Sequence, residues 1–226
     1  MTTDAPVPTG NPFATRYTRP DAGEYLFPTD ANADCLVVRL CQFGWWGQIT
    51  GPHGSGKSTL VQTLLPRLEA AGRSVQFYLF QPTPPRHGRA IPSRIAVAEP
   101  LAGGSRSQSL ADLRRASTTD WNSRTQIVVD GYEQLSWLRR TWLKRRCRRR
   151  RAGLLVTAHG DLGLPPLWQT GISMELARRV VARLLNEHAA DWLDDDQVQR
   201  LLARHGGNLR EVLFQLYDLF EQHQRG

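Results

Sequence analysis

The stretch that decides the fold is Gly51-Pro52-His53-Gly54-Ser55-Gly56-Lys57-Ser58-Thr59. It fits the pattern G-x-x-x-x-G-K-[ST] at every fixed position. Glycines let the backbone turn its N–H groups inward, and the positive end of a following helix attracts phosphate. We therefore expect these nine residues to bind a nucleoside triphosphate, ATP with Mg²⁺. Lys57 is expected to reach the β- and γ-phosphates, Ser58 to ligate Mg²⁺ and Thr59 to hold the α-phosphate.

The flanks of this loop favour the same interpretation over a glycine-rich turn that carries Lys-Ser by chance. A short apolar run, 45–50, precedes the loop, and leucines at helical spacing follow it (Leu60, Leu64, Leu65 and Leu68). The chain has two lysines against 27 arginines, yet one lysine stands at the position where the motif needs it. A GTPase is not indicated, because the chain has no [NT]-K-x-D motif.

A second candidate position is Asp130, which ends the hydrophobic run 126–130. In a parallel sheet such an acid projects at the carboxyl edge, where ligands bind. We assign Asp130 to the Mg²⁺ shell, through water. The alternative is a turn aspartate before Gly131.

The chain alternates apolar runs with amphipathic helical patterns, which predicts an α/β fold with a parallel sheet between layers of helices. The expected strands are 45–50, 74–80, 126–130, 153–158 and 168–173. The expected helices are 30–43 with Asp30 as its cap, 57–72, 110–116, 132–151, 174–190, 194–205 and 208–222. We divide the chain into an extended N-terminal arm (1–29), a core (30–173) and a helical lid (174–226). The Pro-, Gly-, Arg- and Ser-rich residues 82–106 support no assignment.

Together these features resemble the P-loop NTPases of the additional-strand class, and among them a minimal AAA+ module over about residues 30–222. The resemblance implies a three-layer α/β/α core with a five-stranded parallel sheet and a small C-terminal helical lid. Many such ATPases carry a glutamate directly after the metal-binding aspartate, but this chain has Gly131 there. The spacing in DGYE resembles that of NACHT and related signal-transduction ATPases, which implies that Glu133 is the catalytic base. A helix-dipole role for Glu133 is the alternative.

The resemblance also implies residues that sense the nucleotide. Thr157 and His159, at the end of the fourth strand, are both eligible to contact the γ-phosphate or the attacking water. Arg210, near the start of a lid helix that Asn208 is expected to cap, corresponds to the sensor-two arginine. The alternatives are a solvated strand end and a surface arginine. No arginine finger is identifiable, so hydrolysis and ring assembly both stay open.

Residues 139–151 hold nine basic residues and no acid, and the rest of the chain has a net charge of −1. Any anionic partner is therefore expected at this helix. We expect Trp137, Leu138, Trp142 and Leu143 to pack inward and the basic residues to face outward. Nucleic acid, a protein or a neighbouring subunit, an acidic membrane and a plain solvated face all stay open as interpretations.

Three cysteines without metal-ligand spacing, no long apolar run and no secretory pattern at the N-terminus lead us to expect a cytoplasmic protein. The sequence favours an ATPase whose nucleotide state moves the lid and changes the binding of a partner. Two alternatives remain: a small-molecule or nucleotide kinase, and a nucleic-acid-binding module with a regulatory nucleotide site.

Overall fold

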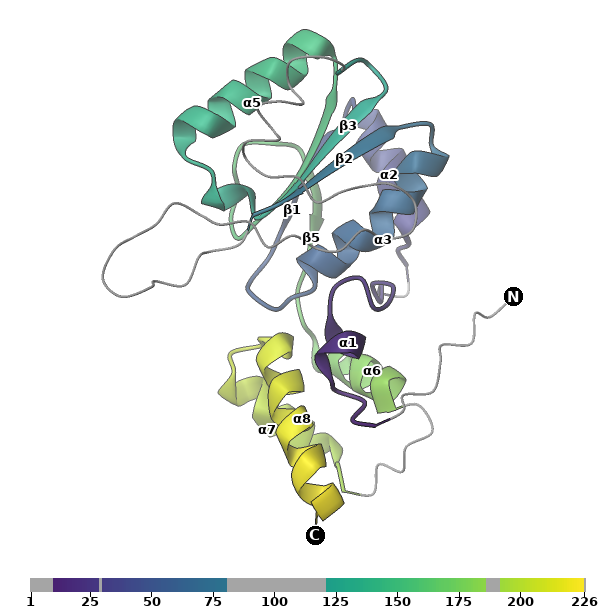
Figure 1. Cartoon of the computed structure of the whole chain (residues 1–226), viewed down its shortest axis with the longest axis vertical. Coiled ribbons are helices and arrows are strands. Elements are labelled where there is room, and N and C mark those ends of the chain that lie inside the picture. Colours follow the sequence, from purple (N-terminus) through teal and green to yellow (C-terminus); the bar gives the residue numbers. More distant parts are fainter. Residues whose placement is uncertain (1–9, 29, 81–120, 186–191, 226) are drawn as a thin grey trace. The chain divides into compact units, whose positions relative to one another are not determined.

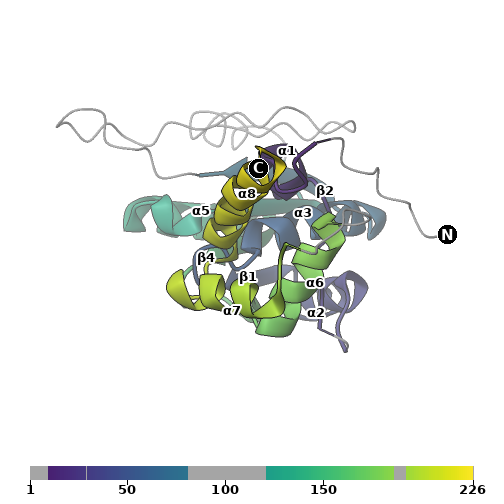
Figure 2. The same cartoon turned by 90° about the horizontal axis from the view of Figure 1, so that it is seen from below.

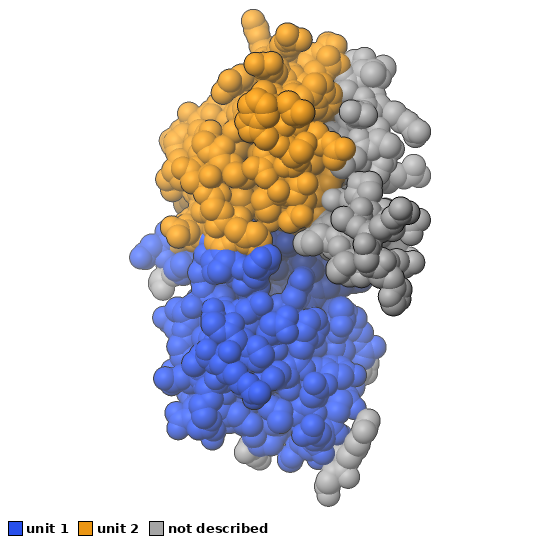
Figure 3. All heavy atoms as spheres, turned by 90° about the vertical axis from the view of Figure 1, so that its left-hand side faces the viewer, with its two compact units in different colours: residues 1–30, 52–63, 170–226 blue, residues 31–51, 64–169 orange. Residues whose placement is uncertain are grey.

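The computed structural model describes residues 10–28, 30–80, 121–185 and 192–225. The segment 82–106 and the helix expected at 110–116 lie outside these residues. The chain forms two compact units, which Figure 3 colours separately. One comprises Met1–Asp30, Pro52–Thr63 and Thr170–Gly226, and the other comprises Ala31–Gly51 and Leu64–Gln169. We call them the loop unit and the sheet unit.

The sheet unit holds an all-parallel sheet of five described strands, as expected for an α/β fold (Figure 1). Its strands, in the order β2-β3-β4-β1-β5, are β1 (Trp46–Thr50), β2 (Ser74–Leu79), β3 (Thr125–Asp130), β4 (Gly153–Ala158) and β5 (Pro166–Gln169). Every residue of β3 and β4 is buried, and the centre of each strand is apolar, 127–129 in β3 and 154–156 in β4. The fifth strand begins two residues before the start that we predicted.

The register of the sheet gathers the candidate positions at one edge. Thr50 of β1 pairs with Ala158 of β4, and Asp130 of β3 pairs with Leu79 of β2. The residues that follow these strands, Gly51, Gly131 and His159, therefore leave the sheet at its carboxyl edge. Because β4 lies between β1 and β3, the strand that precedes the loop and the strand that carries Asp130 are not neighbours.

The helix α2 (Ala33–Gln42) contacts β1 and β5. The Oδ1 of Asn32 accepts a hydrogen bond from the Cys35 amide at 2.8 Å and caps this helix. The predicted cap, Asp30, was therefore wrong by two residues. The helix α3 (Lys57–Ala70) follows the glycine-rich loop, and its leucines are buried as expected.

The basic helix differs from its prediction in start and in orientation. A short 3-10 turn, η1 (Tyr132–Gln134), comes first, and α5 (Trp137–Arg150) begins only after Ser136. Leu143 and Cys147, one turn apart, are fully buried and pack against β3 and β4. The expectation that Trp137, Leu138 and Trp142 pack inward was wrong, because these side chains are exposed.

The loop unit is built around the C-terminal helices α6 (Met174–Leu185), α7 (Asp195–Arg204) and α8 (Leu209–Arg225), which lie side by side (Figure 2). The N-terminal arm contains one helical turn, α1 (Thr15–Thr18), and its Phe13 is buried in the core of these helices. The Nδ2 of Asn11 donates to the Tyr217 carbonyl and to the Glu221 carboxylate, both at 3.0 Å. The described part of the arm, residues 10–28, thus belongs to the folded unit.

No helix in the described part of the chain combines the length and the apolar character needed to cross a membrane.

Candidate functional site

The loop between β1 and α3 has the backbone that its glycines predict. Gly51, Gly54 and Gly56 have positive φ angles of 154°, 68° and 86°. Residues with a Cβ rarely adopt such angles, so glycine is needed to turn the chain from the strand into the helix. The loop ends at Lys57, where α3 begins, so its last residues stand at the positive end of a helix.

Other segments of the loop unit pack closely against two of these glycines. A Cβ on Gly54 would lie 1.8 Å from the Oδ1 of Asn208 and 3.2 Å from the backbone nitrogen of Arg210. A Cβ on Gly56 would lie 3.1 Å from the ring of Tyr25. The loop is therefore in contact with both the N-terminal arm and the first turn of α8.

A hydroxyl pair joins the same loop to the segment before α6. Ser55 donates to the Pro52 carbonyl at 2.8 Å, and its Oγ lies 2.6 Å from the Oγ1 of Thr170. Since Ser55 has one hydroxyl proton, it cannot donate to both oxygens at once. The ammonium of Lys57, largely buried, also donates to the Pro52 carbonyl, at 2.7 Å. Ser58 and Thr59 are half-buried in the first turn of α3, and Pro52 and His53 are exposed.

The lid residues differ in part from their prediction. Leu209, Val212, Leu213 and Leu216 are buried, as expected for the packed face of α8. Asn208 precedes the helix, but its Oδ1 is buried without a hydrogen-bond partner and does not cap it. Arg210 is exposed, and its backbone rather than its guanidinium is what lies next to Gly54.

In the sheet unit, Asp130 is held by Thr157. The carboxylate is buried and accepts a hydrogen bond of 2.5 Å from the Thr157 hydroxyl. The same hydroxyl accepts a bond of 2.9 Å from the Gly131 amide. Its single proton is therefore committed to orienting Asp130, across neighbouring strands of the sheet.

Gly131 explains why no glutamate follows Asp130 directly. Its φ is 81°, and a Cβ at this position would lie 2.1 Å from the Phe80 carbonyl oxygen. A real Cβ cannot approach backbone so closely, so no side chain fits here. The left-handed turn at Gly131 starts η1, which carries Glu133 instead.

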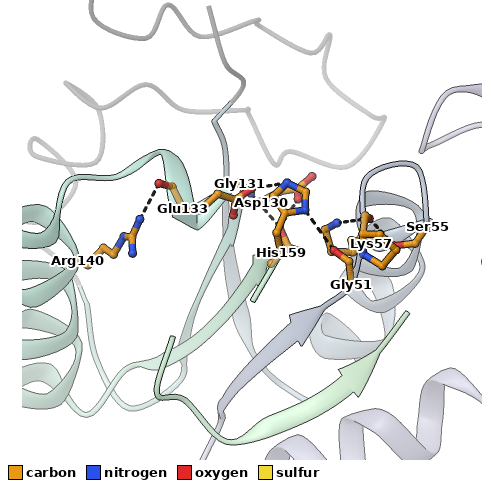
Figure 4. A network of polar contacts seen from close by, with 10 residues as sticks. Gly51, Ser55, Lys57, Asp130, Gly131, Glu133, Arg140 and His159 are labelled. Carbon is orange, nitrogen blue, oxygen red and sulfur yellow. Dashed lines mark hydrogen bonds and ion pairs between the residues drawn. The ribbon is translucent and has the colours of Figure 1, made fainter. Parts of the chain in front are cut away.

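Glu133, His159 and the start of the loop form a chain of polar contacts within the sheet unit (Figure 4). The Nε2 of His159 lies 3.1 Å from the Oε1 of Glu133, and its Nδ1 lies 3.2 Å from the Gly51 carbonyl oxygen. The Oε2 of Glu133 is buried without a hydrogen-bond partner. Arg140 fixes the turn beneath by donating to the carbonyls of Glu133 at 2.6 Å and Leu135 at 2.7 Å.

The segment that follows His159 is fixed by a buried glutamine of β1. Gln48 donates to the Asp161 carboxylate at 2.6 Å and accepts from the Leu162 amide at 2.9 Å. The hydrogen bonds from Gln48 and from the Gly163 amide lower the pKa of Asp161 below its usual value. These hydrogen bonds tie the turn that follows His159 to β1.

The chain thus brings several predicted residues into two groups, each within one unit. The sheet unit joins Asp130, Thr157, Glu133, His159 and Gly51, and the loop unit joins the remainder of the loop to Asn208 and Arg210. Sequence reasoning missed Tyr25, Thr170, Gln48 and Arg140, which position the others. Only Tyr25 had a signal in the sequence, because with Phe13, Tyr17 and Phe27 it is one of the aromatic residues with which the arm could pack across the domain surface.

The donor set suits a metal that is bound largely by water and phosphate. No group of three His, Cys, Asp or Glu side chains in the described ranges could hold a metal ion by itself. An oriented carboxylate such as that of Asp130 is a protein ligand that Mg²⁺ commonly takes beside phosphates. The unpaired oxygens of Asn208 and Glu133 are also positions where a ligand or water could complete a hydrogen bond.

No model of a known protein family matches the chain, and no curated protein matches it either.

Gly131→Ala should destabilise the fold by roughly 1–3 kcal/mol more than Gly163→Ala, because only the first forces backbone to move. Both glycines have positive φ, 81° and 69°, but a Cβ on Gly163 would meet nothing within 4 Å. The shared conformational penalty therefore cancels in the comparison. Urea denaturation of both variants measures the difference, and equal midpoints would show that the turn at Gly131 has room for a side chain.

Proposed function

We propose that the chain is an ATP-binding P-loop protein, an AAA+-like ATPase whose nucleotide state drives a conformational switch that acts on a protein or nucleic-acid partner. The observation that carries the proposal is the loop of residues 51–59. It combines three glycines at positive φ with a lysine at the first residue of α3.

The physical case for a triphosphate rests on the local field of this loop. Inward-turned amides and the start of α3 attract an anion, and the Lys57 ammonium adds a full positive charge. Lys57 is largely buried and already donates to the loop carbonyl of Pro52, so its charge is held at the loop rather than in solvent. The first turn of α8 lies against Gly54, so the positive end of a second helix is also close to the loop.

The sheet supports membership of the additional-strand class of P-loop NTPases. In that class an extra strand separates the strand of the phosphate loop from the strand of the metal-binding aspartate. Here β4 lies between β1 and β3. With α5 packed over β3 and β4 and α2 in contact with β1 and β5, we propose the three-layer α/β/α arrangement of that class.

For Mg²⁺ we propose Ser58 and Asp130, with Thr157 as the residue that positions the aspartate. The ion would neutralise negative charge on the phosphate oxygens during transfer. Asp130 suits a contact through water, because it is buried and one oxygen is already occupied by the Thr157 hydroxyl. Thr59 remains the candidate for the α-phosphate.

Glu133 is the proposed base that takes a proton from the attacking water. One of its oxygens is held by His159, and the other is buried and has no partner in the described structure, so it can accept a proton. His159 links this carboxylate to the Gly51 carbonyl at the start of the loop. We propose that it reports the state of the loop to Glu133.

The switch itself is proposed to lie in the loop unit. The loop is in contact with Tyr25 of the arm, Thr170 before α6 and Asn208 before α8. A phosphate that displaces or engages these neighbours changes the free energy of the arm and the lid, which is what couples binding to conformation. Arg210, in the first turn of α8, is the residue of the lid that we propose to sense the nucleotide.

Lys57→Ala should abolish binding of Mg-ATP, because it removes the only full charge of the loop. Isothermal titration calorimetry on folded protein measures this, and circular dichroism confirms that the variant is folded. Arg67→Ala is the matched control, since it removes an exposed positive charge from the same helix. Binding that survives in Lys57→Ala, or a native protein that shows no heat with Mg-ATP, would contradict the proposal.

Glu133→Gln should leave Mg-ATP binding intact and slow phosphate release about a hundredfold or more, the usual contribution of general-base catalysis. Glu69→Gln, at an exposed position, is the control that should leave turnover unchanged. The assay follows phosphate release with and without a panel of nucleosides. Unchanged turnover in Glu133→Gln would remove it as the base, and transfer of phosphate to a nucleoside would favour a kinase instead.

A further inference from the structure

The outward face of α5 presents large apolar side chains beside arginines. Trp137 is 73% exposed, Leu138 70% and Trp142 39%. Together with Arg145, Arg146 and Arg149 they line a shallow surface groove along the helix. We call these six residues the Trp-Arg face. Two exposed tryptophans on one helix are unusual. Exposed apolar groups of this size commonly mark a binding surface.

The rest of the helix shows that this exposure is not a packing defect. Leu143 and Cys147 anchor the opposite face in the core, and burial raises the pKa of the Cys147 thiol to about 12. Arg140 and Lys144 are used internally, since they donate to backbone carbonyls of η1 and of the segment after β4. By contrast, Arg145, Arg146 and Arg149 form no ion pair with any acid in the described parts of the chain.

We propose that the Trp-Arg face binds single-stranded nucleic acid, with the indole rings stacked on unpaired bases and the arginines on phosphates. Stacking on aromatic side chains and a cationic track are the two elements of such sites. Leu138, Trp142, Arg145 and Arg149 follow one another at spacings of four, three and four residues, which places them in one row along the helix. Arg145 and Arg149 are about 6 Å apart along the axis, so they can meet different phosphates of an extended strand.

The charge of the Trp-Arg face and the positions of its apolar residues favour single-stranded nucleic acid over a membrane, a protein or a nucleic-acid duplex. A helix that lies on a membrane needs an apolar face along its length, but here the exposed apolar residues are confined to the first half of α5 and the second half is basic. The core of a protein interface is depleted in charge, whereas three of the seven residues that line this groove are arginines. Duplex fits less well, because its bases are stacked on each other and are not available to the indoles.

The test is fluorescence anisotropy of labelled oligothymidylate and oligouridylate titrated with the full chain, without nucleotide, over a series of salt concentrations. The inference concerns α5 alone, so it can hold or fail separately from ATP binding. Trp137→Ala/Trp142→Ala should weaken binding about tenfold or more and leave the salt dependence unchanged. Arg145→Ala/Arg149→Ala should also weaken binding, and should make the slope of log K against log salt shallower by roughly 1.4.

Two control variants match these changes elsewhere. Phe214→Ala removes an exposed aromatic ring from α8, where Phe214 is 46% exposed, and Arg204→Ala removes an exposed arginine from α7. Both should bind as the native chain does. A duplex of equal length and vesicles with anionic lipid are the competing ligands. No binding of either oligonucleotide at low salt, unchanged affinity in the tryptophan variant, or binding of vesicles but not oligonucleotides would each overturn the inference.

Discussion

The fold and the candidate site both depend on a short stretch of backbone that only glycine can form. Gly54 and Gly56 have positive φ, and each lies against a segment distant in sequence, Asn208 and Tyr25 respectively. These contacts leave no room for a Cβ without movement of the neighbour. The same glycines that would turn amides towards the proposed phosphate therefore also let the arm and the lid approach the loop. One backbone constraint thus underlies both the proposed binding and the proposed coupling.

A similar constraint at Gly131 sets the chemistry at the sheet edge. The left-handed turn there allows the Phe80 carbonyl to approach and moves the acid that follows Asp130 to position 133. Thr157, near the end of β4, orients Asp130, and His159, just after this strand, holds Glu133, so two residues close together in sequence support two different carboxylates. The Gly51 carbonyl, in contact with His159, joins this group to the beginning of the loop.

The sequence predicted the features that local pattern determines. The glycine-rich loop, the five strands and the packed face of α8 follow from spacing and apolar runs, and Asp130 is found at the end of its strand. The predicted orientation of α5 was wrong because we assumed that Trp137 and Trp142 are buried. The residues of α5 that face the core are Leu143 and Cys147. The burial of Cys147 was hard to predict, because its neighbours in sequence are arginines. Asn32 rather than Asp30 caps α2 because its side chain, three residues before Cys35, reaches that amide.

Contacts across long sequence distances were beyond such reasoning. Three such contacts join segments that share no local pattern: Tyr25 with Gly56, Thr170 with Ser55 and Asn208 with Gly54.

The most direct test of the account is a crystal structure of the chain with Mg²⁺ and a non-hydrolysable ATP analogue. The account predicts a β-phosphate that accepts hydrogen bonds from the amides of residues 54–58, with the Lys57 ammonium beside it. An analogue bound elsewhere, with no phosphate at this loop, would contradict it.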